Sequence, residues 1–361
     1  MRSTAEEVAG VAAVRAPLVV KRLSVGDRAV AERWDAFVRA CPAATFFHRA
    51  GWQRVIDQVF RHRTHFLYAE RAGVIEAVLP LAQVKSVLFG NSLVSLPFAV
   101  YGGVAASNPE AADLLEVEAQ QTARRLAVDH LELRNLEQRH PEWPRQDLYV
   151  RFRKEIAPEL EANLLAIPRK QRAMVRKGIK NGLRSELDAD IRRFFCLYAD
   201  NVHRHGTPAL PRRYFEELLR VFAGDCDVLT VVDPAGRPLS SVLSFYFRGE
   251  VLPYYAGDEW SARELAANDF KYWELMRRSC ERGLQVFDYG RSKQGTGSYS
   301  FKKNWGFEPE PLFYEYCLYR RNSVPQNNPA NAKYRLLINT WQKMPIAMAN
   351  WLGPFIVRNL G

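Results

Sequence analysis

The feature that most constrains the fold is an order of strands and a helix that occurs twice along the chain. In the first half, the runs HFLYAE, VIEAVLPLAQVK and SLVSLPFAVYGG precede a helix over 109–128 and a strand over 130–135. In the second half, DVLTVVD, PLSSVLSFYF and VLPYYAGD precede a helix over 262–282 and a strand over 285–291. Tyr101-Gly102-Gly103 and Tyr255-Ala256-Gly257 occupy corresponding positions, 154 residues apart. The repetition predicts two copies of one module.

Helices are also expected before the strands of each half. The order helix, helix, antiparallel meander, helix, strand is that of the GNAT-type acyltransferase fold, so we expect an α+β chain with mixed sheets. A length of 361 residues accommodates two domains. We expect an N-terminal GNAT-like module over 17–150, a C-terminal GNAT-like module over 151–321 and, after a polar linker, a helical amphipathic tail over 333–361.

Composition narrows the class of protein further. Apolar residues make up 47% of the chain and charged residues 25%, which are globular proportions. Five scattered cysteines without a C-x-x-C pattern predict a reducing, cytoplasmic location and neither a disulfide framework nor a zinc ribbon. No metal site is expected, because His203 and His205 are two positions apart and would lie on different sides of a helix. The net charge of +11 favours anionic partners: nucleic acid, phosphorylated sugars, CoA or acidic lipid.

A basic helix is the first candidate binding feature. From Ile167 to Arg184 there are seven lysines or arginines and no acid. Four of them are spaced three, four and four residues apart and so form one stripe on a helix: Arg169, Arg172, Arg176 and Lys180. The alternatives are a solvated face and a site for a polyanion such as a nucleic-acid backbone or a diphosphate.

A glycine-rich segment after the last strand of the second repeat is the second candidate. Its sequence, YGRSKQGTGSYSFKKNWGFEPEP, has no acid between Asp288 and Glu308. Its glycines permit close approach of a ligand to the backbone. Its cations are Arg291, Lys293, Lys302 and Lys303, and its aromatic residues include Tyr289 and Trp305. We expect a substrate site here, in which Arg291 and Lys293 bind a donor or acceptor phosphate.

Two further features bear on cofactor and location. The helix after the fourth strand of the second repeat starts SARELAANDFKYWEL and lacks the glycines with which a GNAT enzyme holds the CoA pyrophosphate, so no bound cofactor is expected. The tail, YRLLINTWQKMPIAMANWLGPFIVRNLG, is basic and apolar without acids. It is too interrupted to span a bilayer, and it either lies in the membrane interface or docks onto the domain.

The chain resembles the FemAB/FemX-like aminoacyltransferases, and more narrowly the FemAB-like proteins associated with exosortase A (PEP-CTERM) systems. The motifs that carry the resemblance are GTPALPRRYFEELL from Gly206, VLPYYAGD from Val251, ANDFKYWELMRRSCERG from Ala267 and FDYGRSKQGTGSYSFKKNWGFEPEPL from Phe287. The resemblance implies tandem GNAT-like modules and transfer of an aminoacyl group from aminoacyl-tRNA to an amine on a peptidoglycan precursor. For the exosortase-linked group it implies an exopolysaccharide or other cell-envelope acceptor, such as an amino sugar or glycolipid.

The resemblance also implies roles for single residues. The essential lysine of the family corresponds to Lys302 or Lys303. Residues that bind the precursor phosphate correspond to Arg204, to Tyr254 or Tyr255, and to Arg54, which stands two positions after Trp52. Arg54 stands where the family has a lysine, and the two differ in hydrogen-bond geometry, so the acceptor is expected to differ from a peptidoglycan precursor.

Three functions therefore remain open at the level of sequence. The first is aminoacyl transfer to an amine, in which Lys302 or Lys303 stabilises the oxyanion and Asp288 or Asp269 is a candidate proton acceptor. The second is an acyl-CoA-dependent N-acyltransferase of the same fold. The third is a non-catalytic binder of polyanions or membrane. The expected partners are a phosphorylated sugar or lipid-linked precursor, tRNA, and the inner membrane face through the tail.

Overall fold

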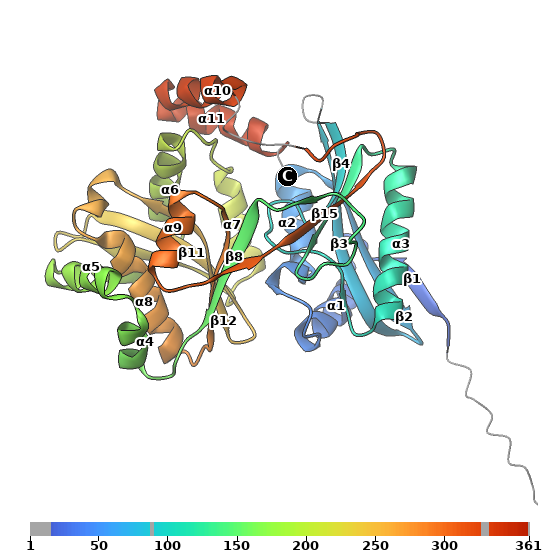
Figure 1. Ribbon diagram of the computed structural model, residues 1–361, viewed down its shortest axis with the longest axis horizontal. Coiled ribbons are helices and arrows are strands. Elements are labelled where there is room, and N and C mark those ends of the chain that lie inside the picture. Colours follow the sequence, from blue (N-terminus) through green and yellow to red (C-terminus); the bar gives the residue numbers. More distant parts are fainter. Residues whose placement is uncertain (1–15, 87–89, 326–331, 360–361) are drawn as a thin grey trace, which may run out of the picture.

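The computed structural model describes residues 16–86, 90–325 and 332–359. Within these ranges the strands form two mixed sheets, one on each side of Figure 1. Helices cover the sheets, and two more follow at the C-terminal end, at the top of the view. The expected α+β architecture of two modules with mixed sheets is confirmed.

The first sheet has the order β1-β2-β3-β4-β6-β15-β7, with β5 paired to β3. Its strands are β1 (Leu18–Arg22), β2 (Arg63–Arg71), β3 (Val74–Ser86), β4 (Gly90–Ser95), β5 (Ala105–Ala106), β6 (His130–Asn135), β7 (Arg145–Gln146) and β15 (Phe313–Leu318). Residues along β2 alternate between two cores, because successive side chains point to opposite faces. Phe66 and Tyr68 pack with α1 (Arg28–Ala40), and Leu67 and Ala69 pack with α3 (Pro109–Arg125).

The second sheet has the order β14-β8-β13-β12-β11-β10-β9. Its strands are β8 (Tyr149–Glu155), β9 (Arg184–Leu187), β10 (Cys226–Val232), β11 (Pro238–Phe247), β12 (Glu250–Asp258), β13 (Val286–Lys293) and β14 (Pro309–Pro311). The helices of this half are α4 (Leu160–Ala166), α5 (Arg169–Lys180), α6 (Arg192–Arg204), α7 (Arg212–Val221), α8 (Ala267–Glu281) and α9 (Gly297–Asn304).

The two halves share one topology. In each, three antiparallel strands are followed by a helix and by a strand that runs parallel to the third. The parallel strands are β4 with β6 and β12 with β13. β12 and β13 are hydrogen-bonded only where Glu250–Val251 lies beside Val286–Phe287. Beyond that point the two strands diverge, which leaves space between their carboxyl ends.

The chain crosses between the sheets at both ends of the second module. After β7, the strand β8 pairs with β13 in the second sheet, and β15 returns from the second module to pair with β6 in the first. The range 151–321, expected from sequence to form the second module, therefore includes β15, which is a strand of the first sheet. This return is anchored by Glu315, whose buried carboxylate accepts hydrogen bonds from Asn135 Nδ2 and from the backbone N–H of His140.

An aromatic core joins the two modules. Phe46, in the 3₁₀ turn Phe46–His48, stacks on Phe245 of β11 with ring centroids 4.4 Å apart, and its ring lies 4.8 Å from that of Phe222. Trp52, in α2 (Gly51–Val55), lies 5.2 Å from Phe222. At the edge of this core, Arg49 of the first module pairs with Asp225 of the second at 2.5 Å. Because these side chains form one buried cluster, the two modules share a hydrophobic core.

We expect Phe46→Ala to lower the free energy of unfolding by about 3–5 kcal/mol, since the substitution opens a cavity in a close-packed core. Chemical denaturation measures the change, and calorimetry should show both modules unfolding in one transition. Phe355→Ala is the matched control, because Phe355 is exposed and its loss should leave stability nearly unchanged. Two separate transitions in the unsubstituted protein would contradict a shared core.

Candidate active site

A cavity of about 390 Å³ lies between the two modules, and we call it the inter-module cavity. The first module contributes Phe98 and Val100, from the segment after β4. The second module contributes the diverging ends of β12 and β13 and the connection between α6 and α7. The second-module residues that line it are Tyr198, Thr207, Pro208, Leu210, Tyr254, Tyr255, Tyr289, Gly290 and Arg291, and Val357 of the C-terminal helix closes one side.

A β-bulge explains how two adjacent tyrosines both reach the cavity. Along β12, Tyr255 pairs with Leu243 and Pro253 pairs with Ser244, so Tyr254 is an extra residue without a partner on β11. A bulge re-aims side chains that would otherwise alternate between the faces of the sheet. The Tyr254 hydroxyl donates to the carbonyl of Phe98 at 3.0 Å, and the Tyr255 hydroxyl lies 3.0 Å from that of Tyr214. Burial raises the pKa of both phenols, so both remain neutral hydrogen-bond donors.

Arg291 supplies positive charge to the cavity. Its guanidinium lies 4.6 Å from the ring centre of Tyr149 and donates to the Tyr314 hydroxyl at 3.2 Å. Among the described residues no carboxylate forms an ion pair with it, although it faces three phenols. A largely buried guanidinium held by aromatic rings retains its charge for an anionic group of a ligand.

Lys302 lies behind the strand segment that carries Arg291. Its side chain is buried, and its Nζ donates to the carbonyls of Tyr289 at 2.7 Å, Arg291 at 3.0 Å and Gly290 at 3.4 Å. Burial lowers the pKa of the amine to about 7, against the opposing effect of the Asp288 carboxylate. Lys303, the next residue of α9, is exposed. The structure thus distinguishes two lysines that the sequence left equivalent.

Asp288 connects this lysine to the first module. Its buried carboxyl group accepts from the Tyr101 hydroxyl at 2.9 Å and from the backbone N–H of Gly290 at 2.7 Å. Burial raises the pKa of the carboxyl group, mainly because the charged form is removed from water. Tyr101 therefore holds the β13 segment from the opposite module. The other candidate proton acceptor, Asp269, instead accepts from the indole N–H of Trp305 at 3.0 Å.

Four residues expected at the substrate site do not line the inter-module cavity. Arg54 is half-exposed on α2 and lies 3.7 Å from Glu217. Arg204, at the end of α6, pairs with Asp200 at 2.8 Å. Lys293 ends β13, and Trp305 is buried in the core of the second module. Trp305 is buried because the helix α9 packs against β13, a tertiary contact that an aromatic residue in a glycine-rich segment does not reveal.

The basic stripe lies on another part of the second module. Arg169, Arg172, Arg176 and Lys180 fall on α5, which packs against α8 through Gly178 and Phe270. Arg172 is half-buried, the other three are exposed, and none of the four forms an ion pair with a described residue. The stripe is therefore accessible to a polyanion but separate from the inter-module cavity.

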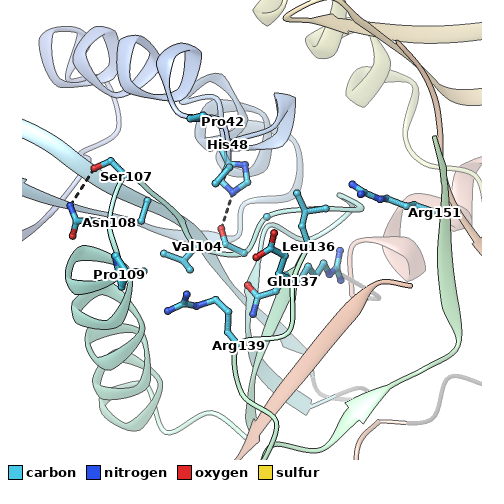
Figure 2. Close-up of a pocket in the computed structure, with 17 residues that line it drawn as sticks. Pro42, His48, Val104, Ser107, Asn108, Pro109, Leu136, Glu137, Arg139 and Arg151 are labelled. Atoms are coloured by element: carbon cyan, nitrogen blue, oxygen red, sulfur yellow. Dashed lines mark hydrogen bonds between the residues drawn. The ribbon is translucent and has the colours of Figure 1, made fainter. Parts of the chain in front are cut away.

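A second cavity, of about 470 Å³, lies mostly in the first module near the start of α3, with Arg151 contributed by β8 of the second sheet (Figure 2). Its three arginines are each held by a carboxylate, in the pairs Arg134–Glu132, Arg139–Glu116 and Arg151–Glu310. Burial lowers the pKa of His48 to about 4, so this side chain is neutral at pH 7. Sequence reasoning missed this cavity. The sequence signal for it is the pair Gly102-Gly103. Glycine is required at position 103 because a Cβ there would lie 2.0 Å from Asn135 Oδ1.

The two cavities differ in what they offer a ligand. The cations of the first-module cavity are neutralised by acids, whereas Arg291 in the inter-module cavity faces phenols and lies next to the carbonyls that hold Lys302. Over the described ranges, no group of three or more His, Cys, Asp or Glu residues gathers as metal ligands would. The inter-module cavity is thus the stronger candidate for binding an anionic ligand, next to a buried amine whose pKa is lowered.

Comparison with known proteins gives matches to the second module and to the overall fold. Residues 169–303 match the family described as an acetyltransferase (GNAT) domain. No curated protein matches the sequence. The crystal structure of FemX superposes with a TM-score of 0.66 at 15% identity, covering 82% of this chain and 97% of that one. The L-PGS structure from Bacillus licheniformis gives a TM-score of 0.56 at 11% identity, covering 87% of this chain and 97% of that one.

A third similar structure is the C-terminal domain of a protein assigned as a lysylphosphatidylglycerol synthetase from Agrobacterium fabrum. It superposes with a TM-score of 0.56 at 15% identity, covering 81% of this chain and 92% of that one. Identities this low establish a shared fold. The chain therefore has a GNAT-like fold, and residues 169–303 of its second module match an acetyltransferase (GNAT) domain.

Proposed function

We propose that the protein transfers an aminoacyl group from aminoacyl-tRNA to an amine on an anionic cell-envelope or exopolysaccharide precursor. The observation that carries the proposal is the buried amine of Lys302, which lies directly behind the strand segment that lines the inter-module cavity. The similarity to the FemX fold supports the same reaction class. The resemblance of the sequence to FemAB-like proteins of exosortase A systems suggests the acceptor.

The proposed reaction forms a C–N bond and breaks an ester C–O bond. The acceptor nitrogen attacks the ester carbonyl, and the negative charge that develops on its oxygen is stabilised by the Lys302 ammonium once the ester replaces one of its carbonyl partners. The acceptor nitrogen then loses a proton, and the released ribose oxygen gains one. Arg291 and the hydroxyls of Tyr254 and Tyr255 bind the acceptor phosphate. The α5 stripe binds the tRNA backbone.

An acyl-CoA donor is the second candidate, because residues 169–303 match an acetyltransferase domain. The start of α8 argues against it. This helix begins at Ala267 without a glycine, and its first turn carries Asp269. A carboxylate at a helix N-terminus disfavours the pyrophosphate that such a terminus would otherwise bind.

Donor dependence tests the proposed function. Purified protein is incubated with labelled aminoacyl-tRNAs, and separately with labelled acyl-CoAs, each with a cell-envelope extract as acceptor. We expect transfer of label from aminoacyl-tRNA that is abolished by ribonuclease. Transfer from acyl-CoA alone would instead establish the second candidate, and binding of extract components without any transfer would favour a non-catalytic role.

Lys302→Ala should reduce the transfer rate by about 100-fold or more, equivalent to about 3 kcal/mol of transition-state stabilisation by one buried donor. Lys303→Ala is the matched control, because Lys303 is adjacent in sequence but exposed. Initial rates of label transfer measure both variants, and circular dichroism verifies that each is folded. Equal loss in the two variants would exclude the proposed role of Lys302.

The pH dependence of Lys302 gives a second prediction. Since the pKa of its amine is lowered to about 7, the ammonium form is lost as pH rises through about 7. The rate of the unsubstituted protein relative to Lys302→Arg should therefore fall above pH 7, because arginine keeps its charge. Comparing the two removes the effect of pH on the acceptor amine. A ratio that rises with pH would indicate that the neutral amine acts as a base.

Arg291→Gln should raise the KM for a phosphorylated acceptor by about tenfold or more and change kcat less, because the guanidinium binds the acceptor in both ground and transition states. Arg192→Gln, an exposed arginine on α6, is the control. Steady-state kinetics at varied acceptor concentration measures the effect. An unchanged KM for Arg291→Gln would place the acceptor phosphate elsewhere.

A further inference from the structure

The C-terminal helix α11 (Ile346–Val357) has one face against the protein and one face in solvent. Ala349, Gly353 and Val357 are buried, and Gly353 lets the helix approach the carbonyl of Ala209 in the α6–α7 connection. On the outer face, Met348, Trp351 and Phe355 are 51%, 68% and 58% exposed. Their spacing of three and four residues places them on one side of the helix, where the rings of Trp351 and Phe355 lie 6.0 Å apart.

Cations lie near the C-terminal end of this helix. The carbonyl of Arg358, just after α11, accepts from the ring of His62 at 2.7 Å. His62 belongs to a shallow hollow that Arg61, Arg63 and Arg213 also line, with Asp57 as its one acid. All three arginines are exposed, and none forms an ion pair with a described residue. The chain from 322 to 361 contains no aspartate or glutamate.

An apolar aromatic helix face next to unpaired arginines has the chemistry of a surface that binds anionic lipid. The aromatic and aliphatic side chains insert at the level of the headgroups, and the cations are attracted to the lipid phosphates. In the described part of the chain, no helix is long and apolar enough to cross a membrane. We propose that α11, together with Arg61, Arg63 and Arg213, docks the protein on the surface of a membrane that contains anionic phospholipid.

The helix that carries the docking face also borders the inter-module cavity. Val357, on the inner side of α11, lines that cavity. The exposed Thr207 lies on the rim of the cavity, in the α6–α7 connection against which α11 packs. Docking through the outer face of α11 therefore brings the cavity close to the lipid surface (Figure 1, where α11 lies at the top). This indicates a lipid-anchored, phosphorylated acceptor. That choice of acceptor rests on the proposed function, whereas the docking does not.

The test uses the full chain and sedimentation with vesicles of phosphatidylcholine, with or without phosphatidylglycerol. We expect binding to the anionic vesicles that weakens with added salt. Trp351→Ser with Phe355→Ser should lower the partition coefficient by about tenfold or more. Arg61→Gln with Arg213→Gln should weaken binding to anionic vesicles and leave any binding to phosphatidylcholine unchanged.

Leu165→Ser with Ile179→Ser is the matched control, because both residues are exposed apolar side chains near the cations of α5. This variant should bind vesicles as the unsubstituted protein does. Failure of the unsubstituted protein to bind anionic vesicles, or loss of binding in the α5 control alone, would overturn the proposal. So would a dimer in sedimentation velocity that the α11 variant abolishes, because a second copy would then cover this face. None of these measurements needs a donor or acceptor, so a negative result would count against membrane docking and not against the proposed transfer.

Discussion

Phe46 stacks on Phe245 across the boundary between the modules, and the geometry of the whole molecule depends on this contact. The first sheet is covered by helices of its own module, α1 on one face and α3 on the other. The aromatic residues that precede the first meander pack against β11 of the other module. Because close-packed interiors tolerate little displacement, this shared core holds the two sheets in one relative orientation. Phe98 and Tyr254 can then meet across the boundary at hydrogen-bond distance.

The candidate site follows from that orientation together with the divergence of β12 and β13. The bulge at Tyr254 and the gap between the parallel strands open the cavity, and Tyr101 reaches across from the first module to hold Asp288. Desolvation lowers the pKa of the Lys302 amine, and backbone carbonyls of β13 compensate for its burial by accepting its hydrogen bonds. Backbone geometry thus places the buried amine of Lys302, on α9, against the β13 segment that carries Arg291.

Much of the architecture could be predicted from sequence because it rests on local patterns. Alternating strands, glycine turns and amphipathic helices gave the order of both modules, and Tyr254, Tyr255 and Arg291 do line one cavity. What could not be predicted depends on distant contacts. The return of β15 to the first sheet requires pairing with β6. The difference between Lys302 and Lys303 depends on which side of α9 packs against β13, and the site of Arg204 depends on its contacts with Asp200 and the carbonyl of Asp258.

The measurement that tests the central claim most directly is chemical blocking of the inter-module cavity. A cysteine is placed at the rim as Thr207→Cys in a Cys196→Ser background, which removes the exposed native thiol, and is labelled with a bulky thiol reagent. Val74→Cys in the same background provides a label far from the cavity. We predict that labelling Thr207→Cys abolishes aminoacyl transfer, that the acceptor slows the labelling, and that the Val74→Cys label has no effect. Transfer at an unchanged rate by the labelled Thr207→Cys protein would contradict the assignment of this cavity as the site of reaction.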